Sequence, residues 1–151
     1  MFLSNKDLQR WLILVAVVHI VAGIALPIFA YSTAFDFYSD RLGEVFWIFQ
    51  EVPQETKEFQ RWIVALFGPT IASWGVLMAY LVKTGAKTNE PWPWNVLLLA
   101  IVLWAPADIG ISLLHNFWLH VQIDVFAVLA IVPPTLLLRA RAIKNQKRRY
   151  K

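Results

Sequence analysis

The sequence predicts an all-α integral membrane protein: a bundle of four transmembrane helices with both termini in the cytoplasm and a short amphipathic helix outside the membrane between the first two spans. Composition is the first reason, because 58% of the 151 residues are hydrophobic and 16% are charged, whereas a soluble domain has about 25% charged residues. The second reason is four long apolar segments, and the third is a bias in where lysine and arginine lie. A chain of this length is expected to form one domain.

The four spans follow from the length of the apolar segments. An α-helix needs about 20 mostly apolar residues to cross the hydrocarbon layer, and the spans are expected at 11–31, 62–82, 94–114 and 117–138. The first apolar run is too long for the core of a cleaved signal peptide, so we expect it to stay as a membrane anchor. Almost nothing separates the last two spans, which predicts a tight antiparallel hairpin.

Residues at the span boundaries predict where two of the helices begin. Ser4 and Asp7 have the spacing of a capping box, which indicates that the first helix starts there. Before the third span, Thr88 or Asn89 is expected to cap the helix, with Pro91 in its first turn.

Basic residues indicate the orientation. One group precedes the first span, a second lies between the second and third spans, and a third lies in the tail 139–151. The tail contains half of the 14 Lys and Arg in the chain. Four crossings put these three groups on one side, whereas Arg41, Lys57 and Arg61 lie among six acidic residues on the other side. Positive loops favour the cytoplasm. We therefore expect a multi-pass protein of the bacterial inner membrane with cytoplasmic termini. Because the tail directly follows a span, anionic lipids are its expected partner, and no nucleic acid is expected.

The segment between the first two spans has its own helical pattern. Apolar residues recur there at helical spacing, with charged residues between them: Phe35, Tyr38, Leu42, Val45, Phe46 and Phe49. This pattern predicts an amphipathic helix over about 39–50 that lies on the outer membrane surface.

The last two spans carry an unusual group of polar residues. Asp108, Ser112 and His115 fall on one face of the third helix, and His120 and Asp124 are one turn apart on the fourth. Both aspartates are about eight residues from the turn, so the hairpin should bring them level, about 12 Å below it. Ionisable side chains in a membrane normally face protein or water, so we expect the two faces to meet.

We predict that this group lines an outer-leaflet pocket for an apolar or amphiphilic small molecule or a lipid. The expected polar lining is Asp108, Ser112, His115, His120 and Asp124, and the expected apolar walls are Trp104, Trp74 and Trp47. Mid-span Pro69 and Pro106 favour such a cavity, because a proline kinks its helix. Small residues around Pro69 equally favour close helix packing.

Other functions remain open. The aspartates and histidines could form an acid–base pair of a membrane-embedded enzyme acting on a lipid-like substrate, or the relay of a proton-coupled transporter, for which the chain would need to form a homo-oligomer. The protein could also be an accessory subunit, or the polar group could simply hold the hairpin together through hydrogen bonds.

Metals and cofactors are not expected from the sequence. No HExxH or ExxH motif supports a metal site, and His19 lies at a different depth from the other histidines, which argues against haem. The absence of cysteine excludes thiolate metal sites and cysteine nucleophiles.

Overall fold

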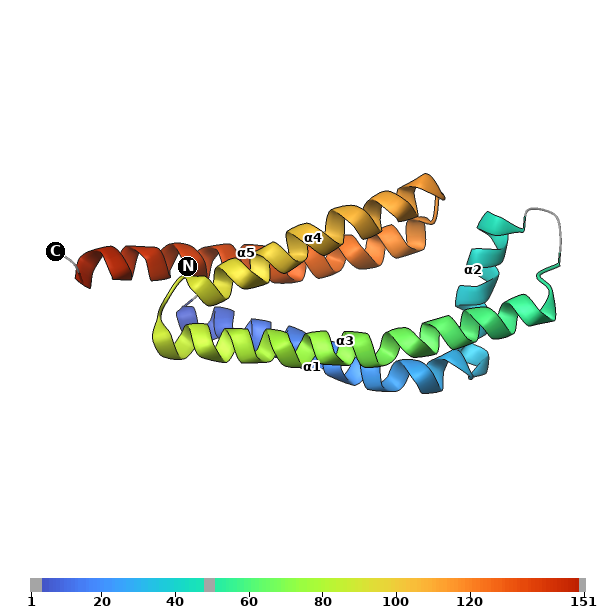
Figure 1. Ribbon diagram of the computed structural model, residues 1–151, viewed down its shortest axis with the longest axis horizontal. Coiled ribbons are helices and arrows are strands. Elements are labelled where there is room, and N and C mark those ends of the chain that lie inside the picture. Colours follow the sequence, from blue (N-terminus) through green and yellow to red (C-terminus); the bar gives the residue numbers. More distant parts are fainter. Residues whose placement is uncertain (1–3, 48–50, 150–151) are drawn as a thin grey trace.

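The computed structural model describes residues 4–47 and 51–149, and within these ranges every regular element is helical. The elements are α1 (Asn5–Ala30), the short 3-10 helix η1 (Thr33–Phe35), α2 (Asp36–Phe46), α3 (Gln54–Thr88), α4 (Trp92–Leu114) and α5 (Trp118–Arg149). The helices α1, α3, α4 and α5 are each long and apolar enough to cross a membrane. The all-helical class is confirmed for the described residues, and the four long apolar helices agree with the four predicted spans. Both chain ends lie at the same end of the bundle (Figure 1), as an even number of crossings requires.

The first two long helices, α1 and α3, pack closely along each other (Figure 1). A Cβ atom on Gly68 would lie 2.5 Å from the carbonyl oxygen of Gly23, and one on Gly75 would lie 2.7 Å from that of Ala16. Backbones at this distance tolerate only the smallest side chains. Gly68 and Gly75 therefore serve close helix packing, which was one of the two interpretations of this stretch of sequence.

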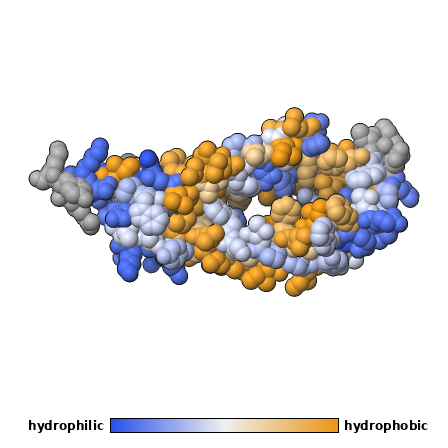
Figure 2. Space-filling model, in the orientation of Figure 1, coloured by the Kyte–Doolittle hydropathy of each residue, from blue (hydrophilic) through white to orange (hydrophobic). Residues whose placement is uncertain are grey.

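The hydrophobic core occupies one half of the bundle. It is built from all four long helices, in the half nearest the chain ends, and consists of Leu8, Leu12, Val15, Ala16, Met78, Val82, Trp94, Leu97, Ile101, Ala105, Ile131, Leu138 and Ala142. Toward the other end the α4–α5 hairpin separates from the α1–α3 pair (Figure 1). Figure 2 shows an opening between the α1–α3 pair and the α4–α5 hairpin.

Two contacts of tryptophan hold the core half together. The indole Nε1 of Trp11 donates a 2.8 Å hydrogen bond to the carbonyl oxygen of Ala130, which lacks its helical donor because Pro134 has no N–H. The indole of Trp94 fills the space over Gly85, where a Cβ atom would collide with the ring. These contacts join α1 to α5 and α3 to α4.

Three boundaries differ from the sequence-based prediction. The helix expected at 39–50 runs from Asp36 to Phe46, and 48–50 lie outside the described residues. Asn89 caps the C-terminus of α3, with a left-handed φ of 55°, instead of beginning the next helix, and Pro91 precedes α4. The basic tail is not a separate segment, because α5 continues through it as a helix to residue 149.

Gly68→Ala should destabilise the protein, because the new methyl group would collide with rigid backbone of α1. Overpacking of this kind costs about 1–3 kcal/mol. Gly110→Ala is the matched control: a Cβ atom there meets nothing within 4 Å, and exchange of a mid-helix glycine stabilises by about 0.5–1 kcal/mol. Thermal unfolding in detergent measures both, and equal melting temperatures for the two variants would contradict the packing described here.

Candidate functional site

The α4–α5 hairpin brings two aspartates and a histidine into one cluster. Nε2 of His120 lies 3.4 Å from Oδ1 of Asp108 and 3.8 Å from Oδ2 of Asp124. One side-chain ligand atom from each of the three residues lies within 4.8 Å of the others. The polar faces of α4 and α5 therefore meet, as the sequence predicted. We call these three residues the Asp–His cluster.

Burial differs across the cluster. Asp124 is only 2% exposed, and its Oδ2 atom has no hydrogen-bond partner. The side chains of Asp108 and His120 are 34% and 32% exposed. The cluster therefore has a buried floor and an accessible side.

Trp104 fixes the orientation of Asp108. Its indole Nε1 donates a 2.8 Å hydrogen bond to Oδ2 of Asp108, one helical turn away on α4. Since Oδ2 is engaged by the indole, Oδ1 is the oxygen that faces His120. Trp104, which the sequence predicted as an apolar wall, is thus also a polar partner of the cluster.

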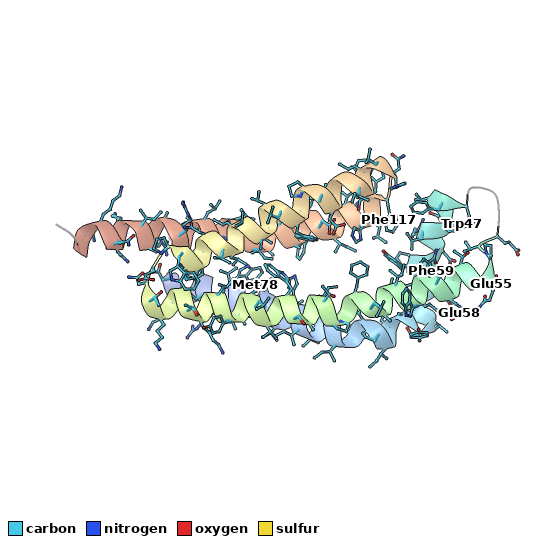
Figure 3. The ribbon with its side chains drawn as sticks, in the orientation of Figure 1. Trp47, Glu55, Glu58, Phe59, Met78 and Phe117 are labelled. Carbon is cyan, nitrogen blue, oxygen red and sulfur yellow. The ribbon has the colours of Figure 1, made fainter. Side chains whose placement is uncertain are left out.

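A row of aromatic rings connects the cluster to the other hairpin. The ring of His120 stacks on Phe117, with centroids 6.0 Å apart, and Phe117 contacts Tyr38 of α2 at 5.6 Å. The row continues through Phe35 to Phe29 at the end of α1. Figure 3 shows Phe117 in the half of the molecule opposite to Met78, which marks the core. The aromatic row bridges the hairpins where the core does not reach.

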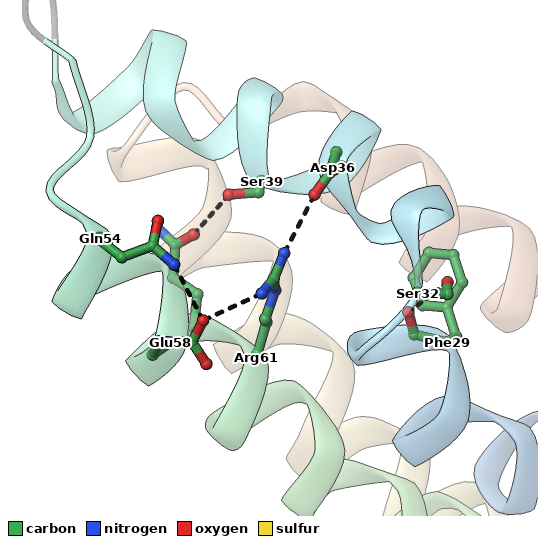
Figure 4. A network of polar contacts seen from close by, with 8 residues as sticks. Phe29, Ser32, Asp36, Ser39, Gln54, Glu58 and Arg61 are labelled. Carbon is green, nitrogen blue, oxygen red and sulfur yellow. Dashed lines mark hydrogen bonds and ion pairs between the residues drawn. The ribbon is translucent and has the colours of Figure 1, made fainter.

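Polar contacts hold α2 against the start of α3. Ser39 donates a 2.9 Å hydrogen bond to the side-chain carbonyl of Gln60, and Arg61 pairs with Asp36 at 3.4 Å and with Glu58 at 3.0 Å (Figure 4). With one side fixed to α3 and the other in contact with Phe117, α2 closes the end of the space between the hairpins.

Tyr38 of α2 lies close enough to the cluster for the charges of Asp108 and Asp124 to affect its phenol. Burial raises the pKa of its phenol, and the carboxylates of Asp108 and Asp124 raise it further. The phenol therefore stays protonated at neutral pH and keeps a hydrogen-bond donor beside the two acids. Sequence analysis placed Tyr38 on the apolar face of this helix, but only the fold brings it near the cluster.

The remaining predicted site residues lie around the cluster. Ser112 is buried on α4. His115 lies at the C-terminal end of α4, and its ring packs on Phe46 of α2 with centroids 5.1 Å apart. It is not part of the Asp–His cluster, although it lies on the side of the cluster nearer the α4–α5 turn.

The two other predicted tryptophans occupy different surroundings. Trp47 contacts Phe46 at the end of α2, and Trp74 is partly buried against the hydrophobic core. Neither tryptophan is in the Asp–His cluster, which consists of Asp108, His120 and Asp124.

A shallow depression of about 340 Å³ lies at the other end of the bundle, between α1 and α3. Its charged lining consists of Lys6, Arg10 and Lys83. It is remote in sequence and in chemistry from the Asp–His cluster and belongs to the basic end of the molecule.

These features define the class of the protein as far as the described residues go: an all-helical chain with four helices long and apolar enough to cross a membrane, which is compatible with a multi-pass membrane protein. Comparison with family models, with curated proteins and with solved structures finds no match.

The contact of α2 with the α4–α5 turn can be tested by crosslinking, because the chain has no cysteine of its own. Phe46→Cys combined with His115→Cys should crosslink efficiently with a short bismaleimide, since the two rings are in contact. Phe37→Cys with His115→Cys is the control, because Phe37 is nine residues earlier and on the opposite face of α2. Gel mobility after protease cleavage between the two positions reads the result, and equal crosslinking of both pairs would show that α2 is not docked.

Proposed function

We propose that the protein binds an apolar or amphiphilic small molecule, or a lipid, in the space between the α1–α3 pair and the α4–α5 hairpin. One observation carries the proposal: the Asp–His cluster lies in the half of the bundle where the hydrophobic core has ended and the hairpins separate. Charged groups inside a membrane are costly and mark functional sites by default.

The shape of the space supports a ligand that enters from the bilayer. The core closes it on one side, and α2 closes it on the other through Tyr38 and Phe117. The opening in Figure 2 shows that the space is not covered on the face seen there. A molecule dissolved in the membrane could therefore reach the cluster sideways without crossing α2.

The chemistry of the cluster favours an amphiphile whose polar end donates hydrogen bonds. Carboxylates accept hydrogen bonds, and Asp108 and His120 are accessible from the space. A hydroxyl or amino group of the ligand would bind there, while its apolar part lies between the hairpins. Ser112 and His115 would flank the polar end, and Trp104, Trp74 and Trp47 would form the apolar walls.

Asp108→Asn should remove the retained ligand. A hydrogen bond to a charged group is worth about 1.5–3 kcal/mol, so affinity should fall at least tenfold. Asp40→Asn is the control, because it makes the same exchange at an exposed position of α2. Native mass spectrometry of protein extracted in mild detergent measures the fraction carrying a lipid-like adduct.

The proposal fails if wild type, Asp108→Asn and Asp40→Asn carry the same adducts in the same amounts. Chemical conversion of a bound molecule by the wild type would instead favour the enzymatic alternative.

We further propose that the chain ends face the cytoplasm. Lys6, Arg10 and Lys83 gather in one depression, and the basic end of α5 lies at the same end of the bundle (Figure 1). A cluster of this kind next to a membrane attracts anionic lipids, which are abundant in the cytoplasmic leaflet. The Asp–His cluster would then lie toward the outer leaflet of a bacterial inner membrane.

Single cysteines test this orientation. Asp40→Cys, on α2, should react with a membrane-impermeant maleimide in intact cells with a permeabilised outer membrane. Lys147→Cys, near the end of α5, should react only after the inner membrane is lysed. The reverse labelling would place the termini outside.

A further inference from the structure

The geometry points to a divalent transition-metal site formed by Asp108, His120 and Asp124. The sequence contains two histidines and two aspartates that could bind a metal, but a metal site was not expected because no metal-binding motif is present. The inference goes beyond ligand binding between the hairpins and does not depend on it, although the two sites share residues.

The spacing of the three ligand atoms fits one metal ion. Metal bonds to carboxylate oxygen and imidazole nitrogen are about 2.0–2.2 Å long, which at tetrahedral angles places two ligand atoms about 3.3–3.5 Å apart. Nε2 of His120 lies 3.4 Å from Asp108 Oδ1 and 3.8 Å from Asp124 Oδ2. All three atoms lie within 4.8 Å of one another, so rotation of one carboxylate would complete the set.

Asp124 supplies independent evidence that something binds there. Its side chain is 2% exposed, yet Oδ2, the oxygen that faces His120, has no hydrogen-bond partner. A buried carboxylate oxygen without a partner is strongly unfavourable. A cation bound between the three residues would give this oxygen the partner that no described protein atom gives it.

The neighbouring side chains hold the ligands in position. Trp104 binds Oδ2 of Asp108 and leaves Oδ1 for the metal. Phe117 stacks on the ring of His120 with an interplanar angle of 14°, which fixes the direction of Nε2. Contacts of this kind around a metal site orient its ligands and typically change metal affinity 10- to 100-fold when removed.

The ligand set selects the metal. One imidazole and two carboxylates suit zinc, manganese or ferrous iron, whereas calcium requires six to eight oxygen ligands, and monovalent copper prefers sulfur. A divalent ion would also balance both carboxylates in a medium of low dielectric constant. Three protein ligands leave a coordination position for water or for an oxygen of a bound molecule.

The experiment uses the full-length protein in detergent, purified through a tag without histidine and treated with a chelator. Zn²⁺ and Mn²⁺ are then titrated separately by equilibrium dialysis with elemental analysis. We expect one ion per chain, at least 100-fold weaker binding in Asp124→Asn and His120→Gln, and 10- to 100-fold weaker binding in Trp104→Phe.

The matched control is His19→Gln. His19 lies in α1 and bonds to the carbonyl oxygen of Val15 in its own helix, so this variant should bind metal as the wild type does. Asp124→Asn removes an unpaired charge and should remain folded even if His120→Gln does not. Cobalt absorption bands that are present in the wild type and absent in Asp124→Asn would identify the coordination directly.

The metal site is refuted if the wild type binds no stoichiometric ion, or if Asp124→Asn binds as tightly as the wild type. Because the titration uses metal alone, its failure leaves the retention of a lipid-like adduct untouched, and loss of the adduct leaves the titration untouched.

Discussion

The close contact of α1 with α3 is the constraint on which the rest of the structure depends. Gly23 and Gly68 bring the two backbones so near that no side chain fits between them, and Gly75 does the same against Ala16. The α4–α5 hairpin has no such contact with this pair. Among the described residues, the core shared by the hairpin and the α1–α3 pair lies in one half of the bundle. There, large residues such as Trp94 and Met78 fill the space between them. The opening between the hairpins follows from this unequal distribution of small and large side chains.

Where the core ends, polar and aromatic contacts hold the helices together. The aromatic row from Phe29 to His120 joins the two hairpins, and α2 is held to α3 by Ser39 and Arg61. Such contacts are weaker than a packed core, because they involve few atoms and partly exposed charges. The Asp–His cluster is thus placed in the least tightly packed half of the molecule, where movement of α2 or of the hairpin would change its access. Sites that admit ligands are commonly found in the less stable parts of a fold.

The sequence allowed the spans and the level of the two aspartates to be predicted, because both depend on local helical geometry. Apolar length sets the spans, and equal distances from a tight turn set the depth of Asp108 and Asp124. Two features escaped prediction, the first because it depends on a contact between distant segments and the second because the local sequence permits two structures. His115 lies at the end of α4, where its ring is drawn to Phe46. Asn89 adopts a left-handed conformation that ends α3, although asparagine is equally suited to begin a helix.

A purely structural role explains the Asp–His cluster poorly. Interhelical bonds between uncharged polar residues would hold the hairpin at lower cost, since an ionisable group in a membrane loses its hydration. A cluster that served only as a clamp should also satisfy its own atoms. Instead, the most buried carboxylate, Asp124, has an oxygen without a hydrogen bond, while His120 lies too far away to donate one to it. These observations support the proposal of a binding site whose remaining partner, a cation or a polar group of a ligand, comes from outside the chain.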